Sequence, residues 1–195
     1  MLNTFIEMIV ETLRAPREMA GRLIAMQLTS QTLWMGFGLL VILNAVVFFT
    51  AQTLLPLPDE VVADMPVVMR SPFLFAILLA GILVVTIHAI YWAGRAMGGQ
   101  AQLVDILAVM TWLQVLRLVA QVALFLLQLI APGLAVLAAM VAGLWGLWLL
   151  VEFIDVAHRL NNRGRALSVL IGAVMALFFG LILIVSLIGL VAIGS

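Results

Sequence analysis

The sequence predicts an all-α, polytopic membrane protein: a bundle of five transmembrane helices preceded by N-terminal amphipathic interfacial helices. Apolar residues make up 66% of the 195 residues and charged residues only 9%, more apolar surface than a water-soluble domain could cover with polar groups. The apolar residues also gather in five long runs, and nearly all charges lie between them. The runs are Leu33–Leu55, Pro72–Ala93, Leu103–Ile130, Gly133–Val156 and Leu167–Gly194.

Each run is long enough to cross the membrane, because a helix needs about 20 apolar residues to span a hydrocarbon core about 30 Å thick. None of the runs alternates apolar and polar faces as a water-soluble helix does. The segments between them are too short to hold a further domain. We therefore divide the chain into a leader, residues 1–30, and a five-helix transmembrane domain, residues 31–195. The first run is expected to act as an uncleaved insertion signal.

The leader is amphipathic. Apolar residues recur at helical spacing on one side of its first half: Leu2, Phe5, Ile6, Ile9, Val10 and Leu13. Pro16 interrupts this pattern and is expected at the first turn of a second short helix with Met19 and Leu23 on its apolar side. Such helices commonly lie in the membrane interface. The leader is thus either an anchor that covers the cytoplasmic mouth of the bundle or an element that docks partners or curves the membrane.

Arginine predicts the topology, because cytoplasmic loops are enriched in basic residues. All nine basic residues of the chain are arginines. Seven of them lie before the first run or in the turns that an odd number of crossings places on the same side: Arg14, Arg17, Arg22, Arg95, Arg159, Arg163 and Arg165. The loop on the other side, residues 56–71, has three acids and only Arg70. We expect a cytoplasmic N-terminus and a C-terminus on the opposite side.

Polar residues inside the third run predict an intramembrane cluster. Gln114, Arg117, Gln121 and Gln128 fall on one helix face. A charge at the depth of Arg117 costs at least about 2.5–3.5 kcal/mol on insertion scales, so a partner is expected. His88 and Glu152 lie at similar depth in neighbouring runs. The expected cluster is His88, Gln114, Arg117, Gln121 and Glu152, acting either as a substrate or proton site or as a structural network that fixes helix packing.

Glu152, Asp155 and His158 form an E-x-x-D-x-x-H series on nearly one helix face, a weak candidate for a divalent metal site. One helix rarely completes such a site, and Arg159 is available to neutralise an acid. We therefore expect no metal and no cofactor. The chain has no cysteine, and it has no motif of a hydrolase, zinc protease or P-loop protein. We expect no catalytic residues, and the absence of a basic block argues against nucleic-acid binding.

Three short segments make the chain resemble the Yip (Ypt/Rab-interacting protein) domain family, in a bacterial member. They are the leader segment Thr12–Ile24 with Pro16, the glycine-glycine turn Met97–Gln100, and a tryptophan-containing fourth span, Trp145–Leu149, followed by a basic turn, His158–Ala166. Their order and spacing match along nearly the whole chain. One departure is that members often have a proline early in the third span, where this chain has none between Trp112 and Leu118 and has Arg117 instead.

The resemblance implies a non-enzymatic protein with five spans and a cytoplasmic N-terminus. Eukaryotic relatives are associated with small GTPases and vesicle traffic, which bacteria lack, so that association does not carry over. Two functional classes remain. The first is a membrane-organising or partner-binding protein in the bacterial inner membrane, in contact with lipid and with a membrane-protein partner or a second copy. The alternative is a small carrier or channel for a lipid, ion or solute that uses the polar cluster.

Overall fold

A computed structural model describes residues 2–56 and 58–193 of the chain, and in these ranges every regular element is a helix. The bounds are α1 (Leu2–Arg14), α2 (Pro16–Ala25), α3 (Ser30–Leu54), α4 (Asp59–Asp64), α5 (Val67–Arg70), α6 (Pro72–Ala96), α7 (Leu103–Ile130), α8 (Pro132–His158) and α9 (Arg163–Ile193). Five of these helices are long and apolar enough to cross a membrane. The predicted fold class, an all-α polytopic bundle, is confirmed.

The five long helices match the five predicted runs, with shifts of a few residues at their ends. The first span begins earlier than its apolar run because Thr29 caps α3, its side-chain oxygen accepting from the Thr32 backbone N–H at 3.2 Å. The last begins earlier because the polar turn continues directly into α9 from Arg163. The predicted end of the fifth run, Gly194, lies outside the described residues.

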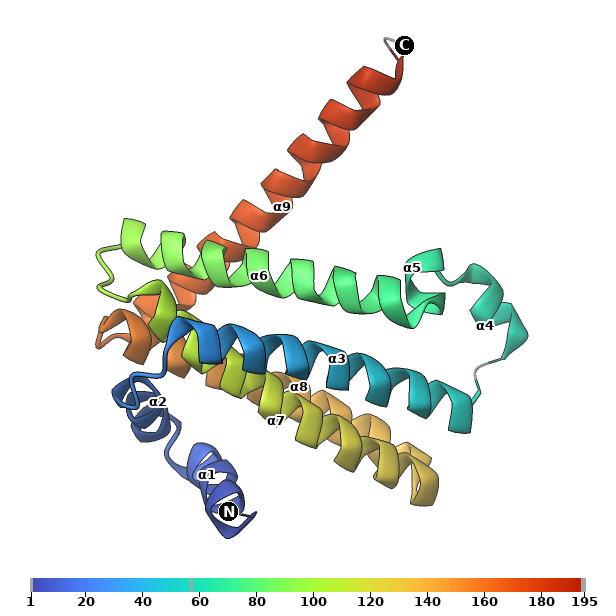
Figure 1. The fold of residues 1–195 in the computed structure, drawn as a ribbon, viewed down its shortest axis with the longest axis horizontal. Coiled ribbons are helices and arrows are strands. Elements are labelled where there is room, and N and C mark those ends of the chain that lie inside the picture. The colour runs from blue at the N-terminus through green and yellow to red at the C-terminus, as the bar shows by residue number, and fades with distance from the viewer. Residues whose placement is uncertain (1, 57, 194–195) are drawn as a thin grey trace.

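Four of the long helices run alongside one another in alternating directions, and the fifth does not (Figure 1). The α3, α6, α7 and α8 helices form this group, in which α7 packs mainly on α3 and α8. The α9 helix begins at the same end as α3 and packs on α6 and α8, and its second half then leaves the group at a steep angle.

Different elements close the two ends of the helix group (Figure 1). The leader helices α1 and α2 lie at the end where α3 begins, together with the turn from α6 to α7 and the turn from α8 to α9. We call this the arginine-rich end, because it includes the seven arginines of the leader and these turns. The opposite end contains α4 and α5, where Arg70 donates to the carbonyls of Ala63 and Met65 at 2.6 and 2.9 Å.

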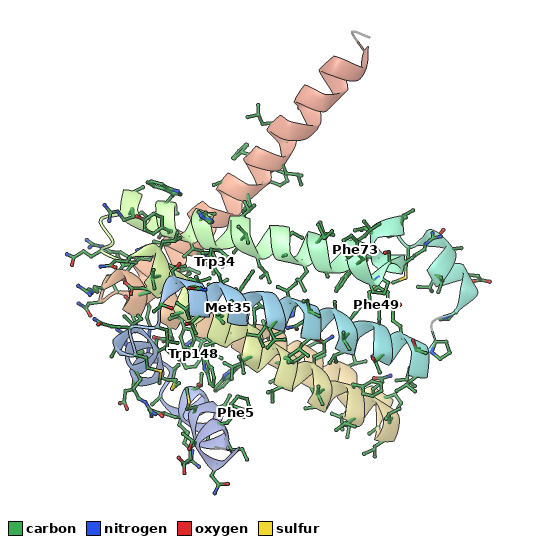
Figure 2. The ribbon with its side chains drawn as sticks, in the orientation of Figure 1. Phe5, Trp34, Met35, Phe49, Phe73 and Trp148 are labelled. Atoms are coloured by element: carbon green, nitrogen blue, oxygen red, sulfur yellow. The ribbon has the colours of Figure 1, made fainter. Side chains whose placement is uncertain are left out.

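The best-packed part of the protein lies at the arginine-rich end. Side chains with no exposed surface come from the leader and from four spans: Met19, Ile87, Ile90, Ile106, Phe153 and Val169. Along the spans many apolar side chains point outward (Figure 2), among them Met35 and Phe73, which are 61% and 72% exposed. Such outward apolar surface suits helices surrounded by lipid tails rather than by water.

Candidate functional site

Two carboxylates are completely buried near the end of α8. Glu152 is 0% exposed and Asp155 is 1% exposed. Their spacing of three residues places them on one face of the helix, so a single cation can reach both. A buried carboxylate without a partner is strongly destabilising, which means that neighbouring elements must supply positive charge here.

Arg17 of α2 supplies this charge to both acids. Its Nη1 donates to Glu152 Oε2 at 3.1 Å and also to Asp155 Oδ2. Arg163, at the start of α9, places its Nε 2.6 Å from the other oxygen of Glu152. The second oxygen of Asp155 accepts from the backbone N–H of Asn162 at 2.9 Å. We call this set, Arg17, Glu152, Asp155 and Arg163, the arginine clamp.

The sequence of α2 explains how Arg17 arrives at the clamp. Pro16 occupies the first turn, as predicted, and Met19, Ala20 and Leu23 are buried against the bundle. This packing fixes α2 against α7 and α8 and holds Arg17 beside the two acids. The hydrogen bond that Arg17 donates to Asp155 raises the pKa of Arg17 more than burial lowers it, so the guanidinium stays charged at any physiological pH.

The first leader helix is joined to the same end of the bundle by contacts with α7. The indole Nε1 of Trp112 donates to the Thr12 hydroxyl at 3.0 Å, and that hydroxyl donates to the Met8 carbonyl at 2.7 Å. Phe5, labelled in Figure 2, meets the Trp112 ring edge-on with centroids 6.2 Å apart. Arg22 of α2 forms an ion pair with Glu11 of α1. The leader is therefore a packed part of the structure.

A histidine fits between two glycines beside the clamp. His158 is fully buried, and its Nε2 lies 3.2 Å from the Ile90 carbonyl oxygen. A Cβ atom at Gly94 or Gly99 would come within 2.1 or 2.4 Å of the imidazole ring. The backbone N–H of Gln100 donates to the His158 carbonyl at 3.0 Å. The glycine-glycine turn and the basic turn, which the sequence analysis treated separately, thus pack directly on each other.

The predicted intramembrane cluster is not brought together as expected. Glu152 contacts Arg17 and Arg163, not Arg117. The His88 Nδ1 atom lies 2.8 Å from the carbonyl of Val84 in its own helix. Gln114 is buried and Gln121 is half-buried, whereas Arg117 is exposed on the surface of α7 and forms no ion pair with any described residue. The arginines at Glu152 come from α2 and α9, so the described residues do not show an ion pair between Glu152 and Arg117.

The three residues of the weak metal-site candidate also have other partners. Glu152 and Asp155 are neutralised by arginine, and His158 faces a backbone carbonyl. Within residues 2–56 and 58–193, no three histidine or acidic side chains are placed to hold a metal ion. Arg159, expected to neutralise an acid, is exposed and forms no ion pair with a described residue.

Sequence reasoning missed Arg17 and Arg163 as the partners of Glu152. A signal for them was present, because two acids three residues apart sit near the predicted cytoplasmic end of the fourth run, where the arginines also gather. What the sequence does not contain is the position of the leader, which could have lain flat on the membrane instead of packing on α8.

Two cavities stand out in the described part of the chain, one at each end. The first, of about 280 Å³, lies at the arginine-rich end between α2, α3, α7 and the residue after α8. The second, of about 250 Å³, lies between the end of α3 and the segment with α4 and α5. Neither cavity is lined by Gln114, Arg117 or Glu152.

These features define the class: a polytopic helical membrane protein whose N-terminal leader is clamped by arginine to one end of its bundle. A family model of the Yip1 domain matches residues 10–184. The chain therefore belongs to the Yip1 domain family, and the resemblance seen in the sequence is confirmed. The match includes α2 and its Arg17 as well as the spans. Comparisons with curated proteins and with solved structures found no match.

Proposed function

We propose that this Yip1 domain protein is a non-enzymatic organiser of the bacterial inner membrane, and that it acts through its clamped leader. The arginine clamp is the observation that carries the proposal. It joins α2 to two buried acids of α8, so the charged groups of the clamp connect elements of the protein to one another. A fixed leader holds its outer surface at a constant position relative to the spans.

That outer surface has the character of a membrane-binding face. The side of α1 that contacts the bundle holds Thr12 and Phe5. Next to it, Ile6, Val10 and Leu13 follow helical spacing and are 50%, 36% and 47% exposed. The apolar arc of α1 is therefore wider than its contact with the bundle. The uncovered part suits insertion among lipid headgroups or contact with an apolar partner.

The arginine distribution supports an orientation with this leader in the cytoplasm. The seven arginines of the leader and the two turns share one end of the bundle, and the other end has Arg70. The positive-inside bias favours this orientation, and α9 then leads the chain to the opposite side. Because the chain has no cysteine, single cysteines at Glu18, Asp64 and Arg165 can be labelled without background. Only the Asp64 position should react in intact cells.

A vesicle experiment tests the organising role. The protein is reconstituted at a fixed protein-to-lipid ratio, and vesicle diameters are measured by electron cryomicroscopy. We expect the protein to narrow the vesicles and Ile6→Asn/Leu13→Asn to restore the diameter of protein-free vesicles. The matched control is Glu7→Gln on the polar face of α1, which should act like the unmodified chain. Unchanged diameters with the unmodified chain would exclude membrane organisation by the leader.

A carrier or channel is the second candidate, and the exposure of Arg117 favours it. This cation lies near the middle of α7 on the same helix face as Gln121 and Gln128, and no described residue pairs with it. Ionisable side chains within membrane spans often mark paths for ions or polar solutes. Solute efflux from the same vesicles distinguishes the candidates, because a carrier gives efflux that Arg117→Leu abolishes and an organiser gives none.

A further inference from the structure

The cavity at the arginine-rich end combines an apolar wall with charges of both signs. Leu23, Leu33 and Ala108 are among its apolar lining residues, and Asp105 and Arg159 are its charged ones. It occupies about 280 Å³, just below the range of about 300–1,000 Å³ typical of small-molecule sites. A site of this size fits a small polar group rather than a whole lipid.

The cavity lies at the depth of lipid headgroups. Ser30 begins α3 and Arg159 directly follows α8, so these lining residues mark the boundary of two predicted spans. Leu33 lies about one turn inside α3, and Ala108 lies more than one turn inside α7. A molecule in this cavity therefore meets charged groups at the membrane surface and apolar groups toward the hydrocarbon.

The two charges face the cavity without neutralising each other. One oxygen of Asp105 accepts from the backbone N–H of Gln102 at 2.9 Å, which leaves its other oxygen available. Arg159 is exposed and makes no ion pair with a described residue. A separated carboxylate and guanidinium complement a ligand that itself carries a separated cation and anion.

The backbone around the cavity supports a role for side chains there. Gln27 and Arg159 both line it, and both have left-handed backbone conformations with φ of 45° and 56°. Glycine is the usual residue at such helix ends because other residues are strained there. This chain instead keeps long polar side chains at both positions, and strained residues gather where a ligand is bound more often than elsewhere.

We propose that this cavity binds the headgroup of a zwitterionic phospholipid with a primary amine, the phosphoethanolamine class. Arg159 holds the phosphate, Asp105 accepts from the ammonium group, and the apolar wall contacts the start of the acyl chains. A carboxylate accepts hydrogen bonds from a primary ammonium but not from a choline, so the site discriminates between the two zwitterionic classes. The inference rests on the proposed function, for which it names the lipid recognised at the clamped end.

Lipid retention measured by native mass spectrometry tests the site. The full chain in mild detergent is exposed to equal amounts of phosphatidylethanolamine, phosphatidylcholine and phosphatidylglycerol. We expect the ethanolamine lipid to be retained about ten-fold over the choline lipid, a difference of about 1.4 kcal/mol. Arg159→Gln and Asp105→Asn should each remove this preference. Asparagine keeps an oxygen that can accept from Gln102, so the start of α7 remains capped.

The matched control is Arg165→Gln, an exposed arginine at the same end that does not line the cavity. It should retain the ethanolamine lipid as the unmodified chain does. Equal retention of ethanolamine and choline lipids, a general preference for the anionic lipid, or equal losses in Arg165→Gln and Arg159→Gln would overturn the proposal. Vesicle diameters are also measured in vesicles that contain no ethanolamine lipid, so that the two proposals are tested separately. If the protein narrows these vesicles but retains no lipid class preferentially, only the lipid site is rejected.

Discussion

Arg17, at the arginine-rich end, and Arg117, in the middle of α7, differ in whether they form ion pairs. Arg17 forms ion pairs with two buried acids while 39% of its own side chain stays exposed. Arg117, within a span, is exposed and has no ionic partner among the described residues. The sequence analysis placed Arg117 and Glu152 in one polar cluster, whereas the arginines beside Glu152 in the structure are Arg17 and Arg163.

The difference between the two arginines follows from the lengths of the acidic and basic side chains and from the positions of α2, α7 and α9 relative to α8. Short carboxylates at Glu152 and Asp155 cannot reach the membrane surface, whereas an arginine can extend inward from the interface and keep part of its length near water. Arginines on α2 and at the start of α9 are therefore better partners than one at membrane depth. The comparison teaches that the acids near the end of α8 are neutralised by arginines of the leader and of the first turn of α9, not by an arginine in the middle of a span. Four predictions test it, from the largest expected effect to the smallest.

Removing Arg17 should give the largest loss of stability. In Arg17→Leu both buried carboxylates lose their shared cation, and Arg163 still reaches only Glu152. Removing one partner of a buried ion pair costs about 3–5 kcal/mol of stability, and we expect a loss at the lower end of this range because Arg163 remains. The loss is measured as the free energy of unfolding in mixed micelles. The control is Arg14→Leu, since Arg14 is an exposed leader arginine that forms no ion pair with a described residue. Equal losses in the two variants would contradict the clamp.

Filling the space beside His158 should cost somewhat less. The Cβ atom of Gly94→Ala would meet the buried imidazole, and overpacking of this kind costs about 1–3 kcal/mol. The free energy of unfolding should fall in Gly94→Ala and recover in part in Gly94→Ala/His158→Ala. Gly81→Ala, in the same helix with nothing within 4 Å of the new atom, should not lower stability, since alanine is favoured over glycine inside a helix by about 0.5–1 kcal/mol. A double variant no more stable than Gly94→Ala alone would show that the ring is not the obstacle.

Loosening the leader at α1 should have a smaller effect. Thr12→Val removes the hydroxyl that accepts from the buried Trp112 indole, and an unsatisfied buried donor costs about 1–3 kcal/mol. We expect the free energy of unfolding in mixed micelles to fall by about 1 kcal/mol, and the tryptophan fluorescence to change as well. Thr53→Val removes an exposed hydroxyl bonded within its own helix and should have no measurable effect. Equal stability of both variants would mean that α1 is not held through Trp112.

Replacing Arg117 should have the smallest effect on folding. Because Arg117 has no ionic partner among the described residues, Arg117→Leu should change the free energy of unfolding by no more than about 0.5 kcal/mol. Membrane insertion of the third span should improve by about 2.5–3.5 kcal/mol, the insertion cost of an arginine at a helix centre, in a glycosylation-mapping assay. A loss of stability as large as that of Arg17→Leu would restore the idea of an Arg117-centred structural network.

The sequence predicted the features that depend on solvent and on local pattern. Run length and composition gave the helical class and five spans, because lipid admits only helices with satisfied backbones. Pro16 marked the start of the second leader helix, and the glycine-glycine and basic turns pointed to the family. These features need no knowledge of which helix lies beside which, so periodicity and composition were sufficient for them.

Only the tertiary structure decided which polar side chains meet. Helical spacing placed Glu152 and Asp155 on one face, yet three different elements could have supplied their cation, and the depth comparison pointed to Arg117 of α7. The choice fell to α2 because buried Met19 and Leu23 fix that helix against the bundle. The reason is physical. A lipid environment stabilises any sufficiently long apolar helix, whichever helices lie beside it. An ion pair forms only when packing brings two particular side chains within a few ångströms.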